Sequence, residues 1–392
     1  MKMDYLEQSF QVHFEYKVFF TENLFDTGNP VFREYLLSQQ SDIRKKLLFV
    51  LDEGVVDHHA GLSFQIKNYL AELPSFSLVA DMLLIPGGEQ AKNDQHAFDK
   101  IIEAVHQYGI DRHSYIVVIG GGSLLDIAGY AAAVSHRGIR LIRIPTTVLS
   151  QNDSGIGVKN GINFFGKKNF LGTFAPPAVV LNDCHFLSTL NERHWLSGIS
   201  EAIKVALIKD ATFFEWIEDN ASKLARRDMP SMQYLIKRCA ELHLQHIAGG
   251  DPFEMGSSRP LDFGHWSAHK LEQLTNFSVL HGEAVAMGII LDSVYSFLSG
   301  KITEEDITRI IDLMKIIGFD LTHPQMKIDD DHSPLITGLN EFREHLGGKL
   351  TIMLLKAIGE GEEVHELDIR ILKRSSDWII KNEMAWIPAT GN

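Results

Sequence analysis

Short apolar runs alternate with helical patterns through the first half of the chain, and this alternation constrains the fold more than any other feature. The runs are brief and mostly bounded by Gly, Pro or Asp. Such runs are typical of buried parallel strands joined by helices, one of which is expected over residues 99–107. The strands are expected at residues 46–51, 82–86, 115–119, 140–144 and 178–181.

From about Leu190 onward the pattern changes to the periodicity of helices. The helices are expected at residues 201–209, 213–224, 232–246, 265–274, 283–298 and 304–316. One late apolar run, residues 349–355, is expected to form a hairpin with residues 364–369. The sequence therefore predicts an α/β domain of nucleotide-binding type over residues 1–190. A mainly helical domain follows over residues 191–392, with the functional site between the two.

Composition excludes several classes of partner. The 392 residues are 45% hydrophobic and 22% charged, which is typical of a folded globular protein. The net charge of −14 would repel nucleic acid and anionic membranes, so neither is an expected partner. The first residues lack an apolar signal core, and two cysteines about fifty residues apart predict no disulfide framework. We expect a cytoplasmic protein with no membrane segment.

A glycine-rich turn follows the strand expected at residues 115–119. Residues 120–129 read Gly-Gly-Gly-Ser-Leu-Leu-Asp-Ile-Ala-Gly. Ser123 and Asp126 form an S-x-x-D capping signature for the next helix. A glycine turn between a strand and a helix N-terminus can bind a pyrophosphate, although a tight turn that needs positive φ would use the same residues.

Three histidines cluster in the helical half. His265, His269 and His281 lie within seventeen positions, which suits a metal ion or proton transfer. With 18 His in the chain, chance proximity is the alternative. Glu201 and Lys204 share one face of an apolar helix, where a half-buried carboxylate would need a positive partner or a divalent ion. A functionally silent ion pair is the alternative there.

Residues 137–204 carry a basic and amide-rich set within an acidic protein. Its members are Arg137, Lys159, Lys167, Lys168, Asn169 and Lys204. Residues 153–159 and 163–169 are glycine-spaced and are expected to form loops whose polar side chains converge on a ligand. For any single lysine, a solvated surface loop is the alternative.

The motifs, taken in order, resemble the sugar phosphate cyclase family, whose founding member is 3-dehydroquinate synthase. They lie at residues 88–92, 120–129, 143–147, 153–159, 166–169, 201–204, 251–254, 263–269 and 280–283. The resemblance implies a Rossmann-like NAD-binding α/β domain followed by a mainly helical metal-binding domain. It also implies an enzyme, a phosphorylated sugar substrate and a homodimer.

The resemblance assigns roles to residues at matching positions. Glu201, His265 and His281 correspond to the ligands of a divalent metal, zinc or cobalt. The residues that correspond to catalytic groups are Lys159, Lys204, Glu254 and His269. Those that correspond to substrate-binding groups are Arg137, Asp153, Asn169, Arg259 and Asp262. Those that correspond to NAD-binding groups are Asp52, Glu89, Lys92, Gly121, Gly122, Ser123, Asp126, Thr146, Thr147, Lys168 and Thr189.

The implied reaction oxidises a ring hydroxyl transiently, eliminates phosphate, reduces the ketone again and closes the ring by an aldol step. The departures from the family concern the substrate. 3-Dehydroquinate synthase has an Arg seven residues and an Asn three residues before the first metal-binding His, where this chain has Ser258 and Asp262, and Leu244 replaces a family Lys. An added acid and two lost cations disfavour a substrate carboxylate and suit a neutral polyol, although Arg259 could compensate.

Three segments resemble the valiolone-synthase branch, whose members take sedoheptulose 7-phosphate. They are residues 158–163, 168–173 and 342–348. At His269 the chain instead resembles dehydroquinate synthase. A further interpretation is therefore that the chain belongs to a separate subgroup of ebo-type cyclitol synthases. Three alternatives remain open. They are a 3-dehydroquinate synthase acting on an acidic heptulosonate phosphate, a metal-dependent polyol dehydrogenase, and a cyclase-like protein without enzymatic activity.

Overall fold

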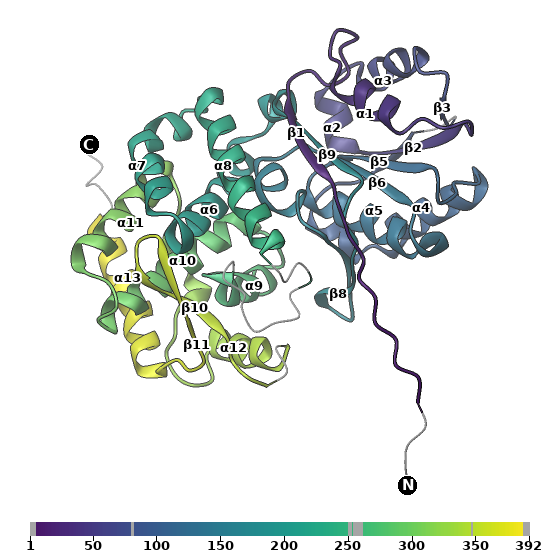
Figure 1. The fold of residues 1–392 in the computed structure, drawn as a ribbon. Coiled ribbons are helices and arrows are strands. Elements are labelled where there is room, and N and C mark those ends of the chain that lie inside the picture. The colour runs from purple at the N-terminus through teal and green to yellow at the C-terminus, as the bar shows by residue number, and fades with distance from the viewer. Residues whose placement is uncertain (1–4, 80–81, 250–252, 254–261, 346–347, 387–392) are drawn as a thin grey trace.

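A parallel sheet forms the N-terminal half of the molecule and a helical bundle forms the C-terminal half (Figure 1). The computed structural model describes residues 5–79, 82–249, 253, 262–345 and 348–386. The main sheet has the order β1-β9-β6-β5-β2-β3, with β4 also pairing with β2, and all of its pairings are parallel. Its strands are β1 (Lys17–Thr21), β2 (Lys45–Asp52), β3 (Phe76–Leu78), β4 (Leu83–Ile85), β5 (Tyr115–Gly120), β6 (Arg140–Pro145) and β9 (Val179–Asp183).

Helices cover both faces of this sheet, as the unbroken apolar strands predict. In β2, Leu47, Phe49 and Leu51 face one core, and Leu48 and Val50 face the other. The first core is closed by α1 (Val31–Ser38) and α3 (Leu62–Ala71), and the second by α4 (Gln95–Gln107) and α5 (Gly122–Val134). A short helix, α2 (Glu53–His58), follows β2 directly. The fold class predicted for this half is confirmed.

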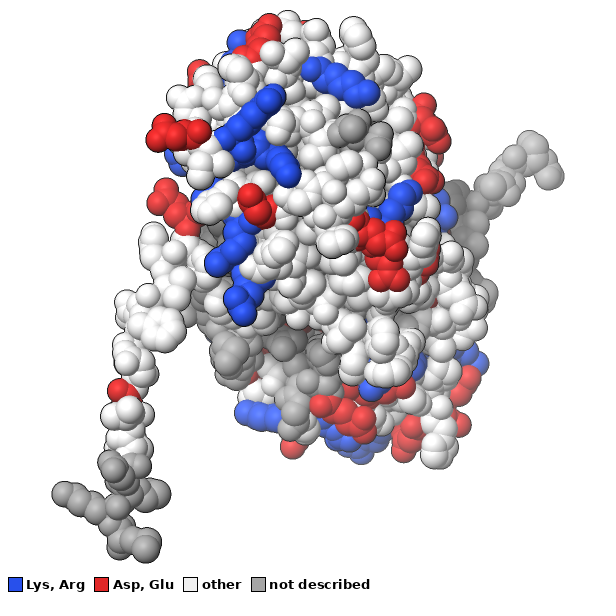
Figure 2. Space-filling view, turned by 90° about the vertical axis from the view of Figure 1, so that its right-hand side faces the viewer, with Lys and Arg blue, Asp and Glu red and all other residues white. Residues whose placement is uncertain are grey.

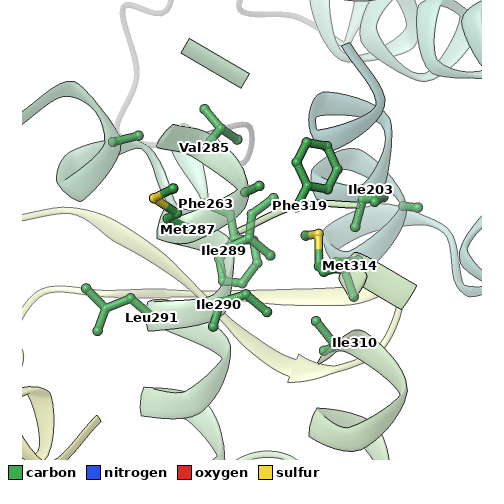
Figure 3. Packing of buried hydrophobic residues seen from close by; sticks show 14 of the residues in the cluster. Ile203, Phe263, Val285, Met287, Ile289, Ile290, Leu291, Ile310, Met314 and Phe319 are labelled. Atoms are coloured by element: carbon green, nitrogen blue, oxygen red, sulfur yellow. The ribbon is translucent and has the colours of Figure 1, made fainter. Parts of the chain in front are cut away.

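The C-terminal half packs around the nearly fully buried helix α10 (His281–Leu298). Side chains of α6, α10 and α11 meet around Phe263 (Figure 3). Burying each Val, Leu or Ile there contributes about 1.5–3 kcal/mol. The other helices are α6 (Glu192–Lys209), α7 (Ala211–Ala225), α8 (Met229–Ala248), α9 (His265–Leu274), α11 (Glu304–Ile317), α12 (Pro334–His345) and α13 (Ile369–Trp386).

Two sequence predictions are corrected. Residues 159–174, part of which was expected as loops, form an antiparallel hairpin of β7 (Lys159–Phe164) and β8 (Lys167–Phe174). The late hairpin exists as β10 (Ile352–Ala357) with β11 (Glu360–Val364), but its second strand ends where the prediction began it. Ile352, the first residue of β10, pairs with Val364. Residues after Val364 therefore have no partner on β10, and the chain continues toward α13.

Charges of both signs lie on the surface, and the first described residues are extended. On the face in Figure 2, acidic and basic side chains are interspersed among wide uncharged areas. Within the described ranges, no helix has the length and apolar character needed to cross a membrane. Residues 5–16 run as an extended segment into the edge strand β1 (Figure 1).

Candidate functional site

The glycine turn lies where β5 ends and α5 begins. Gly121 occupies the N-cap position and has no side chain with which to satisfy the first amide groups of α5, which suits them to bind an anion. A Cβ atom on Gly122 would lie 2.6 Å from Ser154 Oγ, so a glycine is needed for this close approach. The predicted S-x-x-D cap is wrong. The helix starts at Gly122, so Ser123 lies inside its first turn and donates to Glu89 Oε2 at 3.1 Å.

Charged side chains beside the turn pair with one another. Lys92 Nζ lies 2.8 Å from Asp126 Oδ2 and 3.7 Å from Glu89 Oε1. The same ammonium group contacts the amide oxygen of Asn169, which turns Asn169 toward the glycine turn. A dinucleotide at this place would therefore meet free backbone amides and an already balanced set of side chains.

The remaining predicted cofactor residues follow adjacent parallel strands. Asp52 ends β2 and accepts the Gly54 N–H at 2.9 Å, and burial raises the pKa of its carboxyl. Thr146 and Thr147 follow β6, and the Thr146 amide donates to Gly120 at 3.1 Å. Thr189 follows β9, lies 2.8 Å from His59 Nε2 and lines a pocket of about 470 Å³. All of these residues gather at the carboxyl edge of the sheet, where open α/β sheets bind ligands.

The histidine cluster forms where α6, α9 and α10 meet. His265, His269 and His281 each offer a ring nitrogen within 4.8 Å of the others. Glu201 Oε1 lies 3.5 Å from Nε2 of His265 and 3.5 Å from Nε2 of His281. The structure therefore brings together the three residues predicted as metal ligands, and it places His269 beside them.

The second ring nitrogen of both predicted histidine ligands also has an acceptor. His265 Nδ1 lies 3.1 Å from the Phe263 carbonyl, and His281 Nδ1 lies 3.0 Å from Glu272 Oε2. With an acceptor at Nδ1, each Nε2 is left facing Glu201, which is how metal-binding histidines are usually oriented. Glu272 was not predicted, and its one signal in the sequence was its position two helical turns after His265.

Close pairing sets the protonation of these groups. Burial raises the pKa of the Glu201 carboxyl, but Lys204 and His265 outweigh it and hold that pKa well below its usual value. Burial lowers the pKa of His281, but Glu272 outweighs it and raises the pKa to about 9. Burial lowers the pKa of His269 well below its usual value, and Lys168 adds to that shift.

Buried acidic groups extend from the cluster toward the sheet. Lys204 Nζ lies 2.5 Å from Glu201 Oε2, and both side chains are buried. Asp262 Oδ2 is buried without a hydrogen-bond partner among the described residues. Asp153 lies in the π-helical turn η3 (Ser150–Ser154), and its Oδ1 is 2.8 Å from Nδ1 of His243 on α8. His243 was missed because its neighbour His246 made it look like a chance pair.

Two predicted basic residues lie apart from these contacts. Arg137 is exposed in η2 (Ser135–Arg137), between the end of α5 and the start of β6. The 13 residues of α5 span about 20 Å, so Arg137 lies at the opposite edge of the sheet from the glycine turn. Lys159 begins β7 and is exposed. Glu254 and Arg259, like Ser258, lie outside the described residues.

Comparisons with known proteins agree with this arrangement. The family model described as 3-dehydroquinate synthase N-terminal matches residues 82–197, and the model described as 3-dehydroquinate synthase C-terminal matches residues 198–335. A 3-dehydroquinate synthase of Acinetobacter baumannii (strain SDF) is 34% identical over 312 residues, which cover 79% of this chain and 85% of that protein.

Two solved structures share the fold. A 2-epi-5-epi-valiolone synthase from Streptomyces hygroscopicus subsp. jinggangensis 5008, with NAD+ and Zn2+ bound, has a TM-score of 0.86 at 28% identity and covers 96% of this chain and 100% of that one. A 2-deoxy-scyllo-inosose synthase, complexed with carbaglucose-6-phosphate, NAD+ and Co2+, has a TM-score of 0.75 at 24% identity and covers 92% of this chain and 96% of that one. The chain therefore belongs to the 3-dehydroquinate synthase family of sugar phosphate cyclases.

Proposed function

We propose that this chain is an NAD- and divalent-metal-dependent cyclase. Its proposed substrate is a phosphorylated ketose of the sedoheptulose 7-phosphate type, which it converts to a cyclitol with loss of phosphate. One observation carries the proposal: the histidine cluster and the glycine turn belong to one connected site. Lys168 Nζ lies 2.9 Å from Glu272 beside His281, and 4.0 Å from Glu89 beside Ser123.

The donor set fits a divalent metal. Two ligands of a tetrahedral zinc at about 2.1 Å would be about 3.4 Å apart, close to the 3.5 Å between Glu201 Oε1 and each Nε2. Glu201 Oε2 lies 2.5 Å from Lys204 Nζ, which leaves Oε1 to face the two imidazole rings. Glu201, His265 and His281 would hold the ion, which when bound supplies a Lewis acid for substrate oxygens.

The sheet edge fits a dinucleotide. The free amides at the start of α5 would bind a pyrophosphate, and the other proposed contacts come from neighbouring strand ends. When bound, NAD supplies the reversible oxidation of one hydroxyl. The proposed contacts are Asp52, Glu89, Lys92, Gly121, Gly122, Ser123, Asp126, Thr146, Thr147, Lys168 and Thr189.

The chain's own groups would orient the substrate and move its protons. Burial keeps His269 neutral near pH 7, so its ring can accept a proton. Asp153 and Asp262 offer carboxylate oxygens to substrate hydroxyls. We place Lys159, Lys204 and Asn169 against the phosphate and the developing negative charge. Arg137 can join them only from a second copy of the chain, which a homodimer would supply.

Asp262 also supports the choice of sugar. Its buried Oδ2, which has no hydrogen-bond partner among the described residues, would repel a substrate carboxylate and accept a hydrogen bond from a hydroxyl. The valiolone synthase with a TM-score of 0.86 points in the same direction. The 34% identity to a 3-dehydroquinate synthase keeps the acidic substrate as the alternative that an experiment has to separate.

A substrate panel tests the proposal. Zinc-loaded protein with NAD+ is expected to release inorganic phosphate from sedoheptulose 7-phosphate without net NADH. Phosphate release from an acidic heptulosonate phosphate alone would identify a 3-dehydroquinate synthase instead. Net NADH from a plain polyol would identify a dehydrogenase, and no turnover at all would favour a non-enzymatic role.

A double substitution tests the basis of selectivity. Asp262→Asn with Ser258→Arg is expected to move the ratio of kcat/KM values toward the acidic substrate. An unchanged ratio would show that these positions do not select the sugar.

A further inference from the structure

One buried carboxylate touches both halves of the site. Glu272 on α9 is 2% exposed. Its two oxygens accept hydrogen bonds from Lys168 Nζ at 2.9 and 3.0 Å. Glu272 Oε2 also lies 3.0 Å from His281 Nδ1. Lys168 comes from the β7–β8 hairpin of the N-terminal half, whereas His281 begins α10 in the C-terminal half.

The contact differs from an ordinary surface ion pair on the same helix. Lys270 of α9 pairs with Glu341 at 2.8 Å, but the Glu341 side chain is 53% exposed. Exposed pairs of this kind contribute little, because water solvates either partner when the other is removed. A buried carboxylate such as Glu272 has no such substitute, so losing its charge has a large effect on the groups it touches.

Glu272 is one link in a continuous series of polar contacts. Ser123 of the glycine turn donates to Glu89 Oε2 at 3.1 Å, and Glu89 Oε1 lies 4.0 Å from Lys168 Nζ. Lys168 contacts Glu272, and Glu272 contacts His281, whose other nitrogen faces Glu201. The series runs from the proposed pyrophosphate site to the proposed metal ligands without leaving the described residues.

We propose that Glu272 is a positioning residue that serves both sites at once. Through His281 Nδ1 it fixes the ring so that the Nε2 lone pair points toward Glu201, as metal binding requires. Through Lys168 it holds a positive charge beside Glu89 at the glycine turn. The inference rests on the proposed function, because it takes the metal and NAD sites as given.

Binding measurements on Glu272→Gln test the proposal without turnover. The amide keeps the shape of the side chain, but it removes the negative charge and replaces one of the two acceptor oxygens with an NH₂ donor. We expect zinc affinity, measured by competition with a chelator, to fall about 10–100-fold. We expect NAD+ affinity, measured by calorimetry, to fall about tenfold. Glu341→Gln, which breaks the partly exposed pair between Glu341 of α12 and Lys270 of α9, is the control and should leave both affinities unchanged.

The two affinities separate the possible failures. A Glu272→Gln protein that loses zinc affinity but keeps NAD+ affinity would overturn the shared role, and so would the reverse. If the unmutated chain bound neither zinc nor NAD+, the proposed function would fail and this inference with it. Binding by the unmutated chain that is unchanged in the variant would overturn this inference alone.

A second variant guards against a folding defect at the buried site. Lys168, on the β7–β8 hairpin, has a side chain that is 16% exposed, and the second variant is Lys168→Met. It is expected to weaken NAD+ binding and to tighten zinc binding severalfold, because a nearby cation is removed and the full Glu272 charge then acts on His281. Zinc affinity that does not change in Lys168→Met would contradict a link between the two halves.

Discussion

The metal end and the nucleotide end of the site are built on opposite plans. At the metal end, Glu201 faces the rings of His265 and His281 as well as Lys204, and Asp262 Oδ2 has no hydrogen-bond partner within the described residues. At the nucleotide end, the charged side chains already pair with one another, as in Lys92 with Asp126. What that end offers a ligand is backbone: a helix N-terminus behind a glycine turn.

The difference determines how each end recognises its ligand. Unsatisfied buried acceptors create a strong demand for a cation, so recognition at the metal end depends on the charge of individual side chains. Backbone amides are kept in every substitution except one to proline, so recognition at the nucleotide end depends mainly on shape and close approach. Substitutions should therefore act sharply at the first end and gradually at the second.

Glu201→Gln should have the largest effect. It removes the buried charge that faces His265 and His281 and leaves Lys204 unpaired. Breaking a buried charge pair costs about 3–5 kcal/mol, which corresponds to roughly a hundredfold to several thousandfold. We expect loss of bound zinc, measured by elemental analysis of the purified protein, and a comparable loss of phosphate release.

The matched control is Glu218→Gln, which breaks the partly exposed pair of Glu218 with Arg309. Zinc content and phosphate release should not change in that variant. Stoichiometric zinc retained by Glu201→Gln would show that the three histidines suffice, and the comparison of the two ends would lose its basis.

Gly122→Ala should have a smaller effect, confined to the nucleotide end. The added methyl group would lie 2.6 Å from Ser154 Oγ and would crowd the first turn of α5, where we propose that the pyrophosphate binds. We expect NAD+ affinity to fall about tenfold, or 1.4 kcal/mol, with zinc affinity unchanged. Calorimetric titration of each ligand measures both quantities.

Adding Ser154→Ala separates cofactor approach from internal packing. The double variant should recover thermal stability, because the clash is relieved, but not NAD+ affinity. Recovery of NAD+ affinity would show that the glycine serves packing rather than the ligand.

Sequence patterns predicted elements whose stabilising contacts are local or repetitive. The buried strands were predictable because apolar runs such as β5 have both faces covered. The β7–β8 hairpin was not, because its strands mix glycines, lysines and asparagines and are joined by a turn through Phe165 and Gly166 at positive φ. Backbone hydrogen bonds between the two strands stabilise the pairing. The strand sequences show no regular alternation of apolar and polar residues from which the hairpin could be predicted.

The site residues divide in the same way, into those that a sequence pattern predicts and those that depend on contacts distant in sequence. His265 and His281 were identifiable from spacing and resemblance, but their supporting partners were not. Glu272 and Lys168 are 104 residues apart in sequence, so no local pattern joins them. Ser123 was expected to cap its helix, but the helix starts at Gly122, and the Ser123 hydroxyl donates to Glu89 instead. Tertiary contacts decided each of these cases.

His243→Phe should have a moderate effect at the border between the two ends. Burial raises the pKa of Asp153, and Glu201 adds to that, but His243 is among the groups that hold it below its usual value. Without His243 the pKa should rise, so ionised Asp153 would be lost at a higher pH. We expect kcat/KM to fall severalfold and its acid limb to move to higher pH, with the remote His106→Phe as control. An unmoved acid limb would exclude Asp153 from the substrate contacts.

Asp292→Asn should act on stability and should have the smallest effect on the binding of either ligand. Asp292 of α10 is buried and accepts the Gly264 N–H at 2.9 Å and Trp266 Nε1 at 3.0 Å, which fixes the start of α9. Burial raises the pKa of its carboxyl to about 7. A raised folded-state pKa means that its contribution to stability is present below the unfolded value and is lost as pH rises through about 7.

The asparagine variant cannot titrate, and its amide nitrogen replaces one acceptor. We expect its free energy of unfolding to be lower than that of the unmutated chain by about 1–3 kcal/mol near pH 5. The deficit should narrow near pH 8, because only the unmutated chain then bears the cost of a buried carboxylate. Denaturant titration at both pH values measures the gap. If the difference in unfolding free energy is the same at both pH values, Asp292 is ionised at both. The metal end would then hold one more buried charge than its geometry indicates.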